Sequence, residues 1–253
     1  MVHRAHHFSI PFENLDIHLG RGYSFATAHL VAKMVARRRG GFCYELNLLL
    51  AAALRGLGFE VDVLEGQMRR REGGFGAPFD HMTLRVAMPD QDWIADVGNG
   101  ETFQQPLPWD GSWAPQERGG AYRVVRREDG EPPDQPRADS AKAWQVEFQA
   151  NEEAEREVVY HFRSAPRTAA GFLPMLAFHT TSVNSQFTKG WIVTRPLEGG
   201  GRITAARGLL MTTREGKMER HAIRSASELE GILAEDFGML PVAVPPSWFS
   251  RGG

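Results

Sequence analysis

Cysteine is almost absent from this chain, because Cys43 is the only one among 253 residues. A single cysteine excludes an intrachain disulfide and leaves a free thiol, which a reducing compartment would keep available. The N-terminus also lacks the basic and then apolar plan of a signal peptide. We therefore expect a cytoplasmic protein.

Long apolar runs and a strong net charge are missing as well. No apolar run approaches the ~18 residues of a membrane span. A formal net charge of −2 gives no electrostatic footprint for nucleic acid. We expect neither a membrane nor a nucleic acid as partner, while a homo-oligomer stays open. The length fits one large domain or two to three compact ones.

The histidines at the start of the chain, His3, His6 and His7, resemble part of a metal site. No Cys, Asp or Glu in the first seven residues completes a ligand set, so we predict no metal. An extended or turn segment follows at residues 10–16, since Pro11 disfavours helix in the residue before it. Phe12 is expected to pack inward.

Cys43 follows a Gly-Gly pair and opens a helical pattern in the stretch RGGFCYELN at residues 39–47. Apolar residues then recur at the spacing of a buried helix face, and the pattern ends at Gly56 and Gly58. A thiol at a helix N-terminus lies at the positive end of the macrodipole, which lowers its pKa. The alternative is a small buried hydrophobic residue, which describes most lone cysteines.

Two later segments, residues 81–88 and 92–98, alternate as strands joined around Pro89. If the apolar residues of both strands share one face, Met82, Leu84 and Val86 lie opposite Val97, Ala95 and Trp93, and the residue numbers of each pair sum to 179. The other face then carries His81 opposite Gly98, and His81 and Asp96 become diagonal neighbours with Cβ atoms roughly 7–8 Å apart. The pattern thus couples a histidine to an aspartate independently of the cysteine.

Cys43, His81 and Asp96 together form a plausible Cys-His-Asp triad. In such a site His81 takes the thiol proton, and Asp96 fixes the imidazole tautomer. Of the other histidines, only His179 has any case beyond surface or core packing, and that case is weak. Alternating segments through the middle third predict a small antiparallel barrel or curled sheet. Further short strands after residue 190 precede a helix expected to start at a Ser227 N-cap with Glu230 completing a capping box.

The motifs resemble those of the arylamine N-acetyltransferases. RGGFCYELN at 39–47 is similar to the family's nucleophile motif, and HMTLRV at 81–86 and DVGNG at 96–100 match its other two triad positions in order and spacing. IPFENL at 10–15 matches a fourth signature, and SQF at 185–187 falls at a loop near the family's acceptor pocket. The resemblance covers essentially the whole chain.

The resemblance implies an α+β fold of three parts: a helical domain at 1–58 with the nucleophile, an antiparallel β-barrel at 59–165 with His and Asp, and an interdomain segment with an α/β lid at 166–253. The first two parts would resemble the core of papain-like cysteine enzymes. The implied reaction is a ping-pong transfer in which Cys43 takes the acetyl group of acetyl-CoA and passes it to an arylamine, hydrazine or N-hydroxyarylamine. Phe12, Gly98 and Phe187 are the implied substrate-binding residues.

Two departures from the family pattern are visible. Relatives carry about two dozen residues of helix before the position matching Arg4, and these are missing here. Either the chain start was assigned too late, or a reduced helical part works without them. If the missing helices cover core, we expect an effect on stability or solubility more than on chemistry. Asn99 stands where many relatives carry an aromatic residue, which would change acceptor or CoA contacts.

Three alternatives share this sequence pattern. One is an amide synthase of the same family that closes a macrolactam, and another is a cysteine hydrolase or transglutaminase. The third is a binding module with a vestigial site. On charge alone, Arg37, Arg38 and residues 69–71 are candidates for binding the phosphates of CoA. The alternative is that each basic run is simply exposed to solvent.

Overall fold

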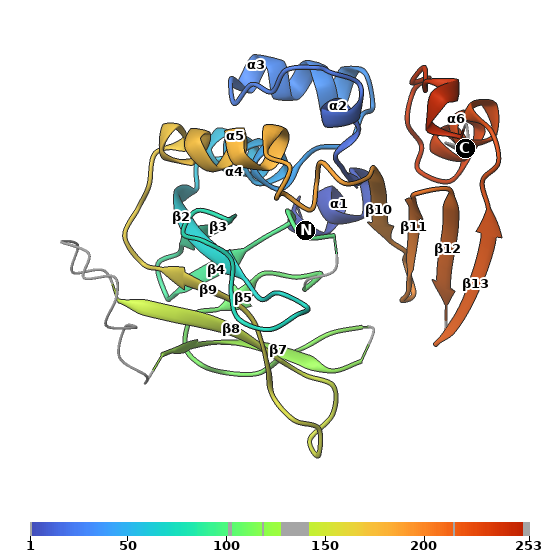
Figure 1. Cartoon of the computed structure of the whole chain (residues 1–253). Coiled ribbons are helices and arrows are strands. Elements are labelled where there is room, and N and C mark those ends of the chain that lie inside the picture. Colours follow the sequence, from blue (N-terminus) through green and yellow to red (C-terminus); the bar gives the residue numbers. More distant parts are fainter. Residues whose placement is uncertain (1, 101–102, 118, 128–141, 215, 250–253) are drawn as a thin grey trace.

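In the computed structural model of this protein, residues 2–100, 103–117, 119–127, 142–214 and 216–249 are described. The chain forms N-terminal helices, an antiparallel sheet that curls into a near-closed barrel, and a C-terminal sheet with a helix (Figure 1). The predicted α+β fold class is therefore confirmed. The boundaries of the three domains stay a prediction.

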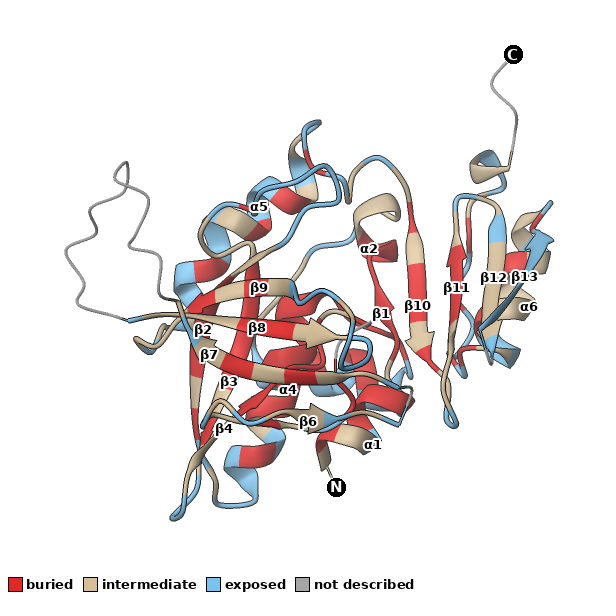
Figure 2. Ribbon diagram, turned by 90° about the horizontal axis from the view of Figure 1, so that it is seen from below, coloured by how far each residue is buried: buried red, intermediate tan, exposed pale blue. Residues whose placement is uncertain are grey.

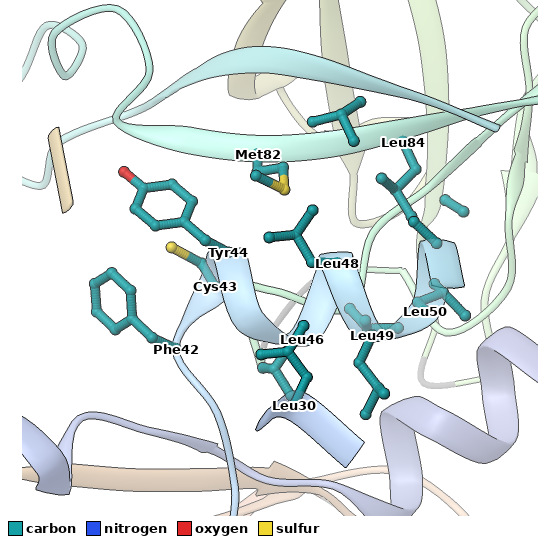
Figure 3. Packing of buried hydrophobic residues seen from close by; sticks show 14 of the residues in the cluster. Leu30, Phe42, Cys43, Tyr44, Leu46, Leu48, Leu49, Leu50, Met82 and Leu84 are labelled. Atoms are coloured by element: carbon teal, nitrogen blue, oxygen red, sulfur yellow. The ribbon is translucent and has the colours of Figure 1, made fainter. Parts of the chain in front are cut away.

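The N-terminal part consists of short helices around one long one. They are α1 (Val2–Ser9), α2 (Leu15–His18), α3 (Thr27–Leu30), the π-helical segment η1 (Val31–Ala36) and α4 (Cys43–Gly56). The apolar spacing correctly predicted α4, whose Leu46 and Leu50 are fully buried. Figure 3 shows Phe42, Cys43 and Tyr44 at the start of α4, with Met82 and Leu84 on one side of the helix and Leu30 on the other.

The barrel sheet has eight strands in the order β5-β4-β3-β2-β9-β8-β7-β6, and β5 returns close to β7. In chain order the strands are β2 (Glu60–Met68), β3 (His81–Ala87), β4 (Asp92–Ala95), β5 (Leu107–Pro108), β6 (Ala114–Pro115), β7 (Ala121–Arg126), β8 (Ala143–Gln149) and β9 (Glu157–Arg163). The predicted β-rich middle third is confirmed. The Pro-rich surface loop expected at residues 131–136 lies outside the described residues.

The register between β3 and β4 is the predicted one. Leu84 pairs with Ala95, and Val86 pairs with Trp93, so paired positions sum to 179. The apolar face packs against α4, as the pattern required. The strand β4 ends at Ala95, however, so the expected pairing of His81 with Gly98 is wrong. Residues 96–98 leave the sheet and turn toward α4.

The second sheet has the order β1-β10-β11-β12-β13. Its strands are β1 (Phe12–Glu13), β10 (Ile192–Pro196), β11 (Arg202–Ala206), β12 (Leu209–Arg214) and β13 (Lys217–Ala222). Within the segment 10–16 that was expected to be extended or a turn, Phe12–Glu13 form an edge strand of this sheet, where Phe12 pairs with Thr194. Leu15 and Asp16 instead belong to α2, so the expectation is wrong for them. The other edge, β13, is exposed throughout (Figure 2).

The helix α6 (Ala226–Glu235) covers the second sheet, but it begins earlier than predicted. Its N-cap is Ser225, whose Oγ accepts a hydrogen bond from the Glu228 backbone N–H at 3.1 Å. Glu230 closes no capping box, because its Oε1 accepts from the Val244 N–H. The Ser227 N-cap prediction is therefore wrong by two residues, since either serine satisfies the local pattern.

Along the chain, the 3-10 turn η2 (Ala169–Phe172) and helix α5 (Leu173–Thr181) follow β9 and precede β10. The sequence of residues 168–179 indicates a connecting helix broken near Pro174. The structure shows this break, since η2 ends at Phe172 and Pro174 lies in the first turn of α5. The last helical turn is η3 (Pro246–Trp248). Its Trp248 packs against the hydrophobic cluster between the second sheet and α6. Within the described part of the chain, no helix combines the length and the apolar character needed to cross a membrane.

A buried ionic network joins the N-terminal segments behind the nucleophile helix. Lys33 Nζ lies 2.7 Å from Asp16 Oδ2 and 2.8 Å from Glu45 Oε2. Arg39 Nη2 bonds Glu13 Oε1 at 2.6 Å and Asp16 Oδ1 at 2.9 Å. Burial alone would lower the pKa of Lys33, but the surrounding carboxylates raise it. Lys33 is therefore charged.

This network corrects two expectations about single residues. Arg39 is buried, so the basic run at 37–39 is not a uniform solvated face. The sequence leaves Glu13 open as a surface group or as a residue that supports the site, and the structure shows it fully buried and bonded to Arg39. Glu45 also accepts a hydrogen bond from the Phe42 N–H at 2.9 Å, which links the network to the start of α4.

We predict that Lys33→Met lowers the free energy of unfolding by about 3–5 kcal/mol, since it leaves the buried Glu45 carboxylate without its cation and Asp16 with Arg39 alone inside the network. Arg21→Ala is the matched control, because Arg21 approaches Asp16 at 3.8 Å from a half-exposed position. Its cost is expected to be about 0–1 kcal/mol. Urea denaturation followed by tryptophan fluorescence measures both, and equal costs would contradict the buried-network interpretation.

Candidate active site

His81 and Asp96 form a direct, buried contact. His81 Nε2 lies 2.6 Å from Asp96 Oδ2, and the two side chains are 2% and 0% exposed. A carboxylate only accepts hydrogen bonds, so Nε2 carries the proton and donates it. The second ring nitrogen, Nδ1, is then left with its lone pair for another proton.

The start of α4 holds the Asp96 carboxylate from the other side. Asn47 Nδ2 donates to Asp96 Oδ1 at 2.9 Å and to the Met82 carbonyl at 2.7 Å, while Asn47 Oδ1 accepts from the Val97 N–H at 3.0 Å. The Gly98 N–H also donates to Asp96 Oδ1, at 2.8 Å. Burial alone would raise the pKa of Asp96, but His81 and these hydrogen bonds lower it. Asp96 is therefore ionised.

Gly98 brings the end of β4 into contact with the nucleophile. A Cβ at this position would lie 2.8 Å from the Cys43 carbonyl oxygen and 3.1 Å from Cys43 Cα. Such contacts are too close for any side chain, so the segment after Asp96 packs directly on the first turn of α4 only because residue 98 is glycine. Cys43, Asp96 and His81 are thus gathered at one place.

Cys43 itself is buried, with 4% of its surface exposed. Burial raises the pKa of the Cys43 thiol well above its ordinary value, and the charges of Asp80 and Asp96 add to that effect. The Tyr44 N–H at the helix start acts in the opposite direction but does not prevail. The expected lowering of this pKa by the helix N-terminus alone is therefore wrong. A thiolate here needs a cation beside it.

His3 of α1 holds the backbone of Asp96. Its Nδ1 lies 3.1 Å from the Gln104 carbonyl oxygen, and its Nε2 lies 3.2 Å from the Asp96 N–H nitrogen. Burial lowers the pKa of His3, so the ring is neutral. The single ring proton can be donated from Nδ1 to the Gln104 carbonyl oxygen or from Nε2 to the Asp96 carbonyl oxygen, each 3.1 Å away. Among the described residues, no group of three or more metal-ligating side chains is placed to hold an ion.

Aromatic side chains line the same region. Phe187 lies with its ring centroid 4.7 Å from Phe42 and 6.2 Å from Phe12, and Phe42 lies 5.7 Å from Phe12. The three therefore form one cluster, with residues from β1, from the residue before Cys43 and from the loop after α5. Phe12 and Phe187, predicted as substrate contacts, are brought together beside the nucleophile, and Gly98 lies against it.

Sequence reasoning gave no role to Asn47, His3 or Asp80. Asn47 was detectable, since it follows Cys43 by four residues and so shares its helix face. His3 was dismissed with the other histidines because its partners are backbone groups about a hundred residues away. No sequence signal identifies such partners.

The arrangement supports nucleophilic catalysis. Transfer of the Cys43 proton to His81 Nδ1 would create a thiolate and an imidazolium, and the ionised Asp96 stabilises that cation. Because the site is buried, the attraction between the two new charges is only weakly screened.

The chain is similar in sequence to one protein family and to individual characterised enzymes. A family model described as N-acetyltransferase matches residues 1–243. The arylamine N-acetyltransferase of Mycolicibacterium smegmatis is 33% identical over 242 residues, which cover 93% of this chain and 82% of the relative. An arylamine N-acetyltransferase / N-hydroxyarylamine O-acetyltransferase of Salmonella typhimurium is 29% identical, covering 94% of this chain and 80% of the relative.

A solved structure agrees with these sequence matches. The arylamine N-acetyltransferase of Mycobacterium marinum in complex with CoA is similar to this chain with a TM-score of 0.77 and 27% identity. The match covers 94% of this chain and 84% of that one.

We predict that Asp96→Asn slows alkylation of Cys43 by iodoacetamide at pH 7 by at least about a hundredfold. The donors Asn47 and Gly98 hold the amide oxygen at the Oδ1 position, which turns the amide NH₂ toward His81 Nε2. Nε2 must then accept, so Nδ1 carries the proton and cannot take one from the thiol.

Asp92→Asn on the same strand is the matched control, because Asp92 pairs with Arg85 at a partly exposed position. Its alkylation rate should equal that of the unmodified protein. Equal rates for Asp96→Asn and Asp92→Asn, in variants with the same circular dichroism, would show that the carboxylate does not control the thiol.

Proposed function

This chain belongs to the arylamine N-acetyltransferase family, and we propose that it transfers an acetyl group from acetyl-CoA to the nitrogen of arylamines, hydrazines or N-hydroxyarylamines through a thioester on Cys43. The observation that carries the proposal is the buried His81–Asp96 pair, which Asn47 and Gly98 hold against the first turn of the Cys43 helix. We assign Cys43 as nucleophile, His81 as proton carrier and Asp96 as the group that orients and stabilises it.

The first half-reaction acetylates the enzyme. His81 takes the thiol proton, and the Cys43 thiolate attacks the carbonyl carbon of acetyl-CoA. The bond from that carbon to the CoA sulfur breaks, and the departing CoA thiolate takes the proton back from His81. The products are free CoA and a thioester on Cys43.

The second half-reaction transfers the acetyl group. The acceptor nitrogen attacks the Cys43 thioester and loses a proton to His81, while the Cys43 thiolate leaves and is stabilised by the new imidazolium. A thioester is reactive enough for a weakly basic arylamine, and Phe12, Phe42 and Phe187 offer it an apolar wall. Gly98 packs on the backbone of Cys43 and so holds the Asp96 segment at the nucleophile.

For the CoA phosphates we propose Arg70 and Arg71 rather than Arg37 and Arg38. Arg70 is an electrostatic neighbour of His179, whose ring packs on Phe42 and Tyr44 at either side of Cys43. The charge of Arg71 lowers the pKa of Arg202 of β11, so Arg71 is an electrostatic neighbour of Arg202. These exposed arginines therefore concentrate positive charge on the side of the molecule where His179 lies, which favours phosphate binding there.

We predict that brief mixing with acetyl-CoA adds one acetyl group to the intact protein, measured by mass spectrometry. The adduct should disappear when 4-anisidine is added, and it should never form with Cys43→Ala. Such behaviour follows from the two half-reactions, since the acetyl group rests on Cys43 between them.

The folded protein without an adduct would reject acetyl-CoA as donor and favour the amide synthase of the same family. An adduct that forms but is stable to every amine tested would reject arylamines as the acceptors. The two outcomes are therefore separable in one experiment.

We predict that Arg71→Gln raises the KM for acetyl-CoA by about tenfold with little change in kcat, because a charge-assisted contact to phosphate is lost. The thioester S-acetyl-N-acetylcysteamine carries no phosphate, so its KM should be the same for both proteins. Arg69→Gln is the control, since Arg69 already pairs with Glu157 at 3.4 Å. Equal effects on both thioesters would move the phosphate site elsewhere.

A further inference from the structure

His179 forms a second histidine–aspartate pair beside the proposed active site. It lies near the end of α5 and is 4% exposed. Its ring centroid lies 5.2 Å from Phe187 and 5.7 Å from Phe42, so it belongs to the same aromatic wall. The proposed mechanism makes no use of it.

The partners of one ring nitrogen determine the tautomer of His179. Nε2 lies 3.3 Å from the Asp80 carbonyl oxygen and 3.4 Å from Asp80 Oδ1. Both oxygens accept hydrogen bonds, so Nε2 carries the proton. Burial lowers the pKa of His179 against the opposing effect of Asp80, so the ring is neutral. Nδ1 is therefore a lone-pair acceptor.

The Nδ1 atom of His179 receives no hydrogen bond from the described residues. In the described part of the chain, His179 Nδ1 is closed to solvent and has no hydrogen-bond partner. Buried acceptors in native proteins are almost always paired, so this unpaired atom in the aromatic wall calls for a donor from outside the chain. Phe187 is the half-buried residue that packs edge-on against the ring.

We propose that His179 Nδ1 accepts a hydrogen bond from an N–H or O–H group on the ring of the acceptor, so that the enzyme favours acceptors such as aminophenols and phenylenediamines. The inference rests on the proposed function, because it concerns the second half-reaction. A flat ring against Phe42 and Phe187 would lie between Cys43 and His179. Its reacting nitrogen then faces Cys43 and His81, while a polar substituent faces Nδ1.

His179→Phe tests the inference, because it keeps an aromatic ring in the wall and removes the acceptor atom. We compare kcat/KM for 4-aminophenol and for 4-methylaniline, whose substituents are similar in size but differ in donating a hydrogen bond. The ratio of the two values should fall about tenfold in His179→Phe. Phe178→Leu, a neighbour on α5 that also touches His179, is the matched control and should keep the ratio.

Cys43 should still take up one acetyl group from acetyl-CoA in His179→Phe, measured by mass spectrometry, so the variant remains competent for the comparison of acceptors. An unchanged acceptor ratio in that variant would overturn the inference while leaving the transferase intact. If no acetyl adduct forms even in the unmodified protein, the proposed function fails instead.

A second measurement needs no change at His179. In Cys43→Ala protein labelled with ¹⁵N-histidine, the Nδ1 resonance of His179 should lie at the position of an unprotonated nitrogen. Saturating 4-aminophenol should shift it upfield, and 4-methylaniline should not. A proton found on Nδ1, or a resonance that 4-aminophenol leaves in place, would overturn the inference.

Discussion

The buried amide of Asn47 is the contact on which the geometry of the site depends. Its two polar atoms reach both strands that carry the other residues of the proposed triad, through Met82, Asp96 and Val97. Since Asn47 is fully buried, water cannot replace any of these three hydrogen bonds, and leaving one unmade would be costly. Asn47 follows Cys43 by one helical turn. The same side chain therefore fixes the nucleophile helix against the histidine and aspartate strands.

A second constraint acts on the opposite side of α4. Glu45 accepts from the Phe42 N–H and binds Lys33, which in turn binds Asp16. The strand β1 joins this network through Glu13 and also joins the C-terminal sheet through Phe12. The short N-terminal segments are thus tied both to the nucleophile and to the distant part of the chain. Apolar contacts of Phe12 and Leu15 with the two cores add to both attachments.

Local periodicity made the triad elements predictable from the sequence. The apolar spacing after Cys43 predicted α4, and the alternation around Met82 and Trp93 predicted the register that makes His81 and Asp96 neighbours. The family motifs supplied the order of the three parts. These predictions succeeded because each rests on residues close together in the chain, or on one hairpin.

Long-range pairing explains what the sequence did not reveal. Nothing local indicates that Phe12 pairs with Thr194, or that His3 bonds the backbone of Asp96. The burial of Arg39 follows from the position of Glu13 and Asp16, which only the folded chain brings close. Local rules also failed where two residues satisfied them equally, as with Ser225 and Ser227 at α6.

The raised pKa of the Cys43 thiol carries a consequence for reactivity. A helix N-terminus in water would keep a thiolate exposed to any electrophile, whereas burial and the nearby carboxylates suppress the lone anion. The thiolate then exists only as a pair with protonated His81, whose charge Asp96 offsets. Nucleophilicity is thereby tied to a proton transfer inside the site. An electrophile must therefore reach this buried pair before it can react, which restricts the chemistry of Cys43 to molecules that the site admits.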